Sequence, residues 1–177
     1  MATAISVIMF GMLYGVYSSG VNIWEISSSQ TDLQAQARNV LNFMSSELKN
    51  ATMHHASANL IIPIPTDPTN TKHSIRFCLP VYTSGSVSID ANGETVWDTA
   101  NFIDYQIIPA QKQLIKYVAG IEQRVIANDV SGVQFIDATI DTSLLLNELR
   151  IIITLNKTTP KQRNVSITLS TTVALRN

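Results

Sequence analysis

The first 24 residues of the chain carry no side-chain charge. They are MATAISVIMFGMLYGVYSSGVNIW (1–24), and the first charged residue is Glu25. As a helix that rises about 1.5 Å per residue, this segment would extend roughly 36 Å, whereas the hydrocarbon layer of a bilayer is about 30 Å thick. The segment therefore predicts a helix that needs an apolar environment, supplied by lipid or by other helices.

A cleaved secretory signal is the alternative interpretation of this opening. Such a signal has a basic stretch, then a shorter apolar run, then small residues at the cut. Ser18, Ser19 and Gly20 are small, but no basic residue precedes them. Apolar residues also continue beyond them, at Val21 and Ile23, so we expect the helix to be retained.

The apolar opening changes into an amphipathic pattern without a helix breaker. Apolar residues recur there at steps of three, four or seven, which places them on one face of a helix. No proline precedes Pro63, and the next glycine after Gly20 is Gly85. The sequence thus predicts one helix over residues 2 to about 52, whose second half packs on a sheet. The residues predicted to make this packing are Leu33, Val40, Leu41, Met44 and Leu48.

A proline-rich connector follows the helix. Pro63, Pro65 and Pro68 lie close together, and this spacing excludes a helix and favours an extended crossing loop. The predicted organisation is therefore a helical spine over residues 1–53 and a connecting loop over residues 54–72. Within the spine, residues 1–24 are the predicted membrane or filament-core segment.

The apolar period changes to two after the loop, which is the period of β-strands. The clearest strand is VSITLSTTVAL (165–175), and NELRIIITL (147–155) is its predicted partner in an antiparallel hairpin. Residues 73–177 are therefore predicted to form an antiparallel sheet that the helix covers, which gives an α+β fold. Further strands are predicted over 74–82, 86–89, 102–108, 113–118, 121–127 and 130–136.

Charge and motifs exclude several classes of function. The 177 residues contain 12 Lys plus Arg and 13 Asp plus Glu, so the net charge of −1 gives no field that would attract nucleic acid. Phosphate loops and the H-E-x-x-H and G-x-S-x-G motifs do not occur in the sequence. Cys78 is the single cysteine, so an internal disulfide is impossible. We expect no enzyme, no cofactor, no metal and no small-molecule substrate.

Several segments resemble those of a known family. ATAISVIMFGMLYGVYSSG (2–20) resembles the interior of the long N-terminal helix of type IV pilin-like proteins. DLQAQARNVLNFMSSELKNAT (32–52) is similar to the second half of that helix in minor pilins of the PilW type and in J-type pseudopilins of type II secretion. In those families an Arg, here Arg38, is followed by an apolar stripe that ends near an acid, here Glu47. The strand-forming segments at the C-terminal end resemble theirs as well.

The resemblance implies a structural subunit. Such proteins rest in the inner membrane by the apolar half of the helix, with the sheet domain outside the cytoplasm. An assembly ATPase system extracts them, and the apolar halves pack into the core of a filament. The implied partners are other pilin or pseudopilin subunits, and membrane lipid before assembly. The alternative, from another class of function, is a membrane-anchored extracytoplasmic domain that binds a ligand or partner with its sheet.

The marks of processing in that family are a basic leader that ends in Gly, a Phe-Thr-Leu run and an early Glu. None of these occurs in the sequence as it stands. The opening resembles a pilin helix entered part-way, because it is apolar from its first residues. We therefore expect the reading frame to continue upstream of Met1 through a Gly-Phe-Thr-Leu-like segment that contains a Glu.

Small residues form a row along one face of the apolar half. Gly11 and Gly15 make a G-x-x-x-G pair, and Ala4 and Ser18 extend the row at helical spacings. Such a row allows a neighbouring helix to approach closely. Each glycine destabilises a helix by about 1 kcal/mol, so we expect a helix–helix contact that offsets this cost. The alternative is chance in a segment rich in small residues.

Polar residues in the sheet region have a functional and a structural interpretation. Asp90, Asn92 and Glu94 surround Gly93 and faintly resemble a calcium loop, but Asn-Gly is also a strong signal for a hairpin turn. We expect the turn. Three histidines flank the proline-rich loop, and their spacing does not match that of ligands on one helical face. We expect them to be solvated; they are His54, His55 and His73.

Two further groups of polar residues also have a functional and a structural interpretation. Asp98 and Asp104 have the residue type of an acid/base pair, but no local feature holds them in that geometry. Lys157, Lys161 and Arg163 form a basic turn between the last two strands. Some minor pilins contact DNA, but such a turn is more often the solvated tip of a hairpin. Nucleic acid is therefore not an expected partner.

Overall fold

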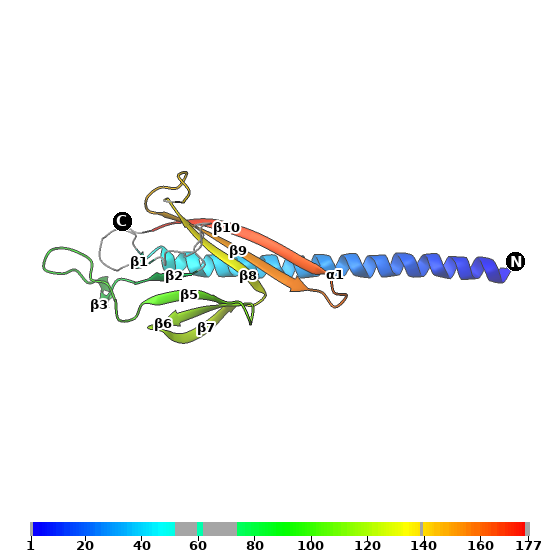
Figure 1. The fold of residues 1–177 in the computed structure, drawn as a ribbon, viewed down its shortest axis with the longest axis horizontal. Helices are drawn as coiled ribbons and strands as arrows, with labels where there is room; N and C mark the ends of the chain where they lie inside the picture. The colour runs from blue at the N-terminus through cyan, green and yellow to red at the C-terminus, as the bar shows by residue number, and fades with distance from the viewer. Residues whose placement is uncertain (1, 52–59, 62–73, 139, 176–177) are drawn as a thin grey trace.

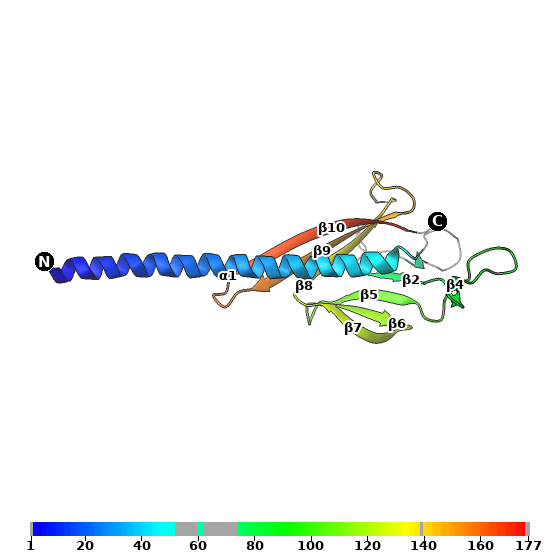
Figure 2. The same cartoon turned by 180° about the vertical axis from the view of Figure 1, so that it is seen from behind.

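The molecule is a long helix that projects from a β-domain (Figure 1). Helix α1 (Ala2–Leu48) is continuous over 47 residues, which corresponds to about 70 Å. Its second half lies along the strands, and its first half extends away from them (Figures 1 and 2). The computed structural model describes residues 2–51, 60–61, 74–138 and 140–175, with side chains described for residues 9–51 and from residue 74 on.

The predicted long helix is confirmed, and it ends a few residues before the expected end. Backbone hydrogen bonds pair carbonyl groups at the end of the helix. The N–H of Lys49 donates to Ser45 O (3.0 Å), and the N–H of Ala51 donates to Leu48 O (2.9 Å). No proline or glycine interrupts the part of the helix that packs on the domain. A single straight element therefore links the apolar segment to the sheets.

The strands form two main sheets and a small hairpin, all with antiparallel pairing. The first sheet has the order β1-β2-β5-β6-β7, the second has the order β10-β9-β8, and β3 pairs with β4. The strands are β1 (Leu60–Ile61), β2 (Ile75–Phe77), β3 (Tyr82–Thr83), β4 (Ser86–Val87), β5 (Ile103–Ile108), β6 (Gln113–Val118), β7 (Ile121–Ala127), β8 (Val130–Asp137), β9 (Glu148–Thr158) and β10 (Asn164–Ala174).

The α+β arrangement agrees with the sequence prediction, but one sheet was expected and the structure has two main sheets. The chain changes sheet at the turn between β7 and β8. Asp129 adopts a left-handed backbone there (φ 58°), and its carbonyl accepts the N–H of Asn156 (2.7 Å). The N–H of Val130 donates to Lys112 O (2.8 Å), which ties the turn to the first sheet. Period-two alternation indicates which face of a strand is buried but not which strand is its neighbour.

The predicted hairpin of the last two strands is confirmed. β9 and β10 pair without a bulge from Glu148 opposite Ala174 to Thr158 opposite Asn164. The alternate residues of β9 from Leu149 to Leu155 are buried, and β10 and β9 make most of the contacts with α1. The hairpin is therefore the main surface on which the helix rests.

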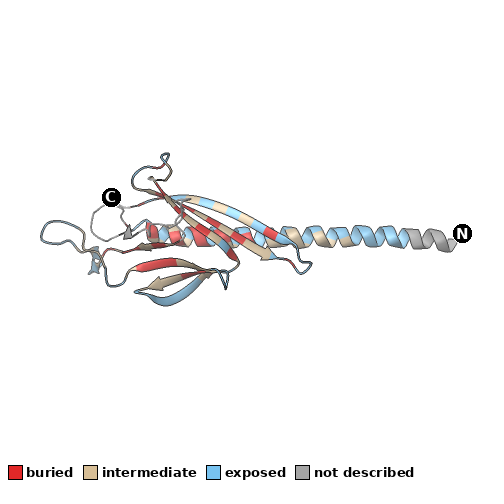
Figure 3. Cartoon of the chain, in the orientation of Figure 1, coloured by how far each residue is buried: buried red, intermediate tan, exposed pale blue. Residues whose placement is uncertain are grey.

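The core is a single cluster that takes residues from the helix and from both main sheets. Figure 3 shows the buried residues concentrated where α1 meets the strands. The sheets contribute large side chains such as Phe77, Tyr105 and Phe135, each fully buried. The helix contributes the residues that its periodicity places on one face: Leu33, Ala37, Val40, Leu41, Met44 and Leu48.

Leu33 gives a direct test of this packing. The side chain is 1% exposed, so Leu33→Ala is expected to lower the free energy of unfolding by about 2–5 kcal/mol. Leu146 is 87% exposed, and Leu146→Ala should change it by less than about 0.5 kcal/mol. Urea unfolding of the full chain in mild detergent, followed by circular dichroism, measures both. Equal midpoints for the two variants would contradict the packing.

Candidate assembly interface

The first half of α1 exposes apolar side chains on every side. Phe10, Leu13 and Tyr14 are 72%, 62% and 73% exposed. Leu13 and Tyr14 are consecutive residues and point about 100° apart on a helix. The side chains of residues 9–17 are all exposed, so the rest of the described chain covers no face of this part of the helix. The other large exposed apolar residues of the segment are Met9, Met12, Val16, Tyr17, Ile23 and Trp24. We call residues 9–24 the exposed half-helix.

An exposed apolar surface of this extent is unusual for a protein that functions alone in water. Monomers rarely expose contiguous apolar patches of more than a few hundred Å², and larger ones mark contacts with proteins or membranes. Within the part of the chain that the structure describes, no helix combines the length and the apolar character of a membrane-spanning segment. The geometry therefore points to a surface that contacts another protein or a membrane.

The row of small residues lies on this surface. Gly11 and Gly15 are exposed, and a Cβ atom added to either would meet nothing within 4 Å. Ser18 is half-buried, and the side chain of Ala4 lies outside the described residues. Among the described residues, the two glycines therefore serve no close approach, and the predicted helix–helix contact stays a prediction.

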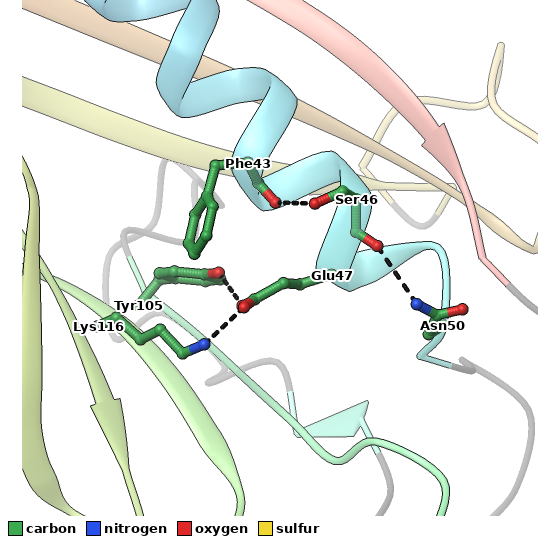
Figure 4. A network of polar contacts seen from close by, with 6 residues as sticks. All are labelled: Phe43, Ser46, Glu47, Asn50, Tyr105 and Lys116. Carbon is green, nitrogen blue, oxygen red and sulfur yellow. Dashed lines mark hydrogen bonds and ion pairs between the residues drawn. The ribbon is translucent and has the colours of Figure 1, made fainter. Parts of the chain in front are cut away.

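A polar clamp fixes the opposite end of the helix to the first sheet (Figure 4). Glu47 Oε1 accepts a hydrogen bond from Lys116 Nζ at 2.6 Å, and Glu47 Oε2 accepts one from the hydroxyl group of Tyr105. Burial and the hydrogen bond to Glu47 both raise the pKa of the Tyr105 hydroxyl, so it remains a proton donor. The helix is thus held by β5 and β6 through one carboxylate.

The aromatic ring of Phe43 completes this clamp. Lys116 Nζ lies 5.6 Å from the centre of the ring, and Arg124 Cζ lies 5.1 Å from it, so both cations meet its π face. Phe43 and Glu47 are one helical turn apart and face the same sheet. Together with the apolar stripe on β9 and β10, these contacts fix the rotation of α1 about its axis.

A second polar contact lies where the exposed half-helix approaches the domain. Lys161 Nζ, in the turn between β9 and β10, donates to Asn22 Oδ1 at 2.5 Å. Further along the helix, Gln36 Nε2 donates to Asn128 O at 3.1 Å, in the turn between β7 and β8. The tip of the long hairpin therefore reaches back to the last residues of the charge-free segment.

The calcium-like sequence forms a turn, as expected. Asp90 Oδ1 accepts the N–H groups of Asn92 (2.8 Å) and Glu94 (2.9 Å), and these bonds lower the pKa of the carboxyl group. Gly93 adopts a left-handed backbone (φ 83°) at the apex. Among the described residues, no group of three or more His, Cys, Asp and Glu side chains is arranged to hold a metal ion. His54, His55 and His73 lie outside the described residues.

Asp98 and Asp104, the two candidates for an acid/base pair, each have another partner. Asp104 is buried and forms a two-pronged ion pair with Arg76, with Nε to Oδ1 and Nη2 to Oδ2 both at 2.7 Å. Asp98 accepts hydrogen bonds from Asn101, which lower the pKa of its carboxyl group. Cys78 is buried, and burial raises the pKa of its thiol. Asp98 and Asp104 therefore each pair with another residue and not with one another, and Cys78 belongs to the buried interior.

Sequence reasoning identified the stripe and the small residues but not the partners of Glu47 and Asn22. The position of Glu47 beside the stripe was a signal that its carboxylate would need a donor from the sheet. Searches of protein families, curated proteins and solved structures found no match for the chain. The features of the chain that bear on its function are therefore the arrangement of the helix and its exposed half.

The clamp is tested by Glu47→Gln. The change keeps the size of the side chain but leaves Lys116, whose side chain is 15% exposed, without its opposite charge. We expect a loss of about 1–3 kcal/mol in the free energy of unfolding. Glu122→Gln on β7 is the matched control, because Glu122 is exposed. If both variants unfold at the same urea concentration, Glu47 does not fix the helix.

Proposed function

We propose that the chain is a structural subunit of a type IV pilin-like filament, a minor pilin or pseudopilin, held in the inner membrane by α1 before assembly. One observation supports this most strongly: a single continuous helix buries one stripe in its own domain and exposes apolar side chains all round elsewhere. A subunit that exchanges one apolar environment for another needs such a helix. The similarity of residues 2–20 and 32–52 to pilin helices points the same way.

The physical basis is that lipid and a bundle of helices are both apolar. Moving the exposed half-helix between them changes little hydrophobic free energy, because its side chains are out of water in both. The helix–helix contacts of a filament then come from close packing, which small residues favour. Gly11 and Gly15 are open in the single chain and are available for that packing.

The attachment of the helix to the domain also suits a filament subunit. The apolar stripe, the Glu47 clamp and the contact between Lys161 and Asn22 hold α1 to both main sheets. The domain would therefore follow its helix as one body when the helix is extracted. The alternative of a simple membrane anchor requires no such attachment and no row of glycines, so the filament subunit is the better supported of the two.

Gly15→Leu separates the two functions. In a single chain the new side chain meets open space and favours the helix, so an isolated anchor should tolerate it. In a bundle that packs on the small-residue row, it should crowd the neighbouring helix. We expect Gly15→Leu to reduce the recovery of the chain in sheared filaments at least several-fold, while its level in the membrane stays normal.

Gly20→Leu is the matched control for this experiment. Gly20 is also open in the single chain, but it lies on the opposite side of the helix from Gly11 by the 3.6-residue period. Its substitution should affect recovery in filaments less than that of Gly15. Normal incorporation of Gly15→Leu would overturn the close contact. Failure to find the unmodified chain with other pilin-like subunits would overturn the filament role itself.

A further inference from the structure

The tip of the hairpin formed by β9 and β10 is a cluster of positive charge. Its sequence, KTTPKQRN (157–164), contains three basic residues and no Asp or Glu. Lys161 and Arg163 are exposed, and Lys157 is half-buried. A net positive charge of three on eight residues stands out in a chain whose net charge is −1. We call residues 157–164 the basic tip.

The basic tip has a defined conformation. The N–H of Thr159 donates to Arg163 O at 2.8 Å, and the N–H of Gln162 donates to Thr159 O at 2.8 Å. The buried hydroxyl group of Thr159 accepts the N–H of Arg163 at 3.2 Å. Gln162 adopts a left-handed backbone (φ 58°) to close the turn. The basic side chains therefore belong to a turn that hydrogen bonds hold in one conformation, at the end of a hairpin without a bulge.

The position of the basic tip along the helix is the decisive feature. Lys161 contacts Asn22, which lies about one helical turn before Glu25, the first charged residue of the helix. Tyr17 and Trp24 lie near this level and are each 70% exposed. Tyrosine and tryptophan are the residues enriched at the boundary between lipid and water. If the charge-free part of the helix is in the membrane, the boundary between lipid and water lies near Glu25, and the basic tip is at that boundary.

We propose that the basic tip binds the anionic head groups of the bilayer in which α1 is held. The proposal rests on the proposed function, because it requires the exposed half-helix to be in the membrane. Lipid phosphates lie at the depth of the tip, so Lys161 and Arg163 would contact them without any change in the domain. Nucleic acid is less well matched, because the basic residues are few and occupy a single turn rather than an extended surface.

The interaction would fix the depth and tilt of the subunit before extraction. Without the tip, the helix resists sliding along the membrane normal only at the two ends of its apolar segment, where the polar flanks would enter the hydrocarbon layer. A basic tip attached to Asn22 adds a second point of contact beside the helix axis. Each basic residue near an anionic surface contributes an attraction that corresponds to about a fivefold change in population.

The test measures the reactivity of lysine amines in the full chain in vesicles. The chain is reconstituted into vesicles of phosphatidylcholine alone or mixed with phosphatidylglycerol, and is acetylated with a reagent that does not cross the membrane. The reactivity of Lys161 is divided by that of Lys49, which is exposed and lies about 40 Å along the helix from Asn22. We expect phosphatidylglycerol to lower this ratio at least about fivefold, and about 1 M salt to restore it.

A pair of variants shows whether the neighbouring cations matter. Lys157→Gln combined with Arg163→Gln should remove most of the protection of Lys161 by phosphatidylglycerol. Arg38→Gln removes a positive charge at an exposed position of α1 beyond the tip, and should leave the protection in place. Both variants retain Lys161 and Lys49 as probes.

The possible failures are distinguishable. If the chain floats with both kinds of vesicle but the ratio is the same in both, the tip does not bind head groups, whereas the proposed function stands. If the chain does not float with either kind of vesicle, the proposed membrane-held subunit and the basic tip proposal fail together. If duplex DNA protects Lys161 in detergent more strongly than phosphatidylglycerol does in vesicles, the tip binds nucleic acid and the lipid proposal is overturned.

Discussion

Burial of one stripe of α1 against two sheets is the interaction on which the rest of the structure depends. Leu33 to Leu48 supply that stripe, and the strands on either side would expose their own apolar faces without it. The stripe fixes the position of the helix, and the Glu47 clamp fixes its rotation. Because an α-helix is stiff and α1 has no break, fixing its second half also sets the direction in which its first half projects.

That rigid coupling divides the helix into a half that the domain covers and a half that the described part of the chain leaves largely exposed. The division explains why the small residues of the exposed half-helix have no close contact within the chain. It also places the end of the long β9–β10 hairpin at the boundary, where Lys161 meets Asn22. A protein built in this way can present one end of its helix to an apolar environment and carry its domain as a fixed body.

Local patterns were enough to predict the helix, its buried face and the last hairpin. Each of these depends on residues that are close in sequence or repeat with a fixed period, such as Val40 and Met44 on one helical face. The division into two sheets, the Tyr105 and Lys116 partners of Glu47, and the contact of Lys161 with Asn22 were not predicted. They depend on which distant segments meet, and periodicity carries no information about that choice. The resemblance to pilin helices guided the proposed function, which the geometry alone would have left open.

The most direct test of this account is to remove residues 1–24 and to compare the free energy of unfolding with that of the full chain. We expect the shortened chain to be monomeric without detergent. Apart from the loss of the contact between Lys161 and Asn22, it should keep the urea midpoint that the full chain has in mild detergent. The buried stripe begins at Leu33, beyond the deletion. A shortened chain that aggregates or unfolds would contradict the division of the helix, because the first half would then be part of the domain.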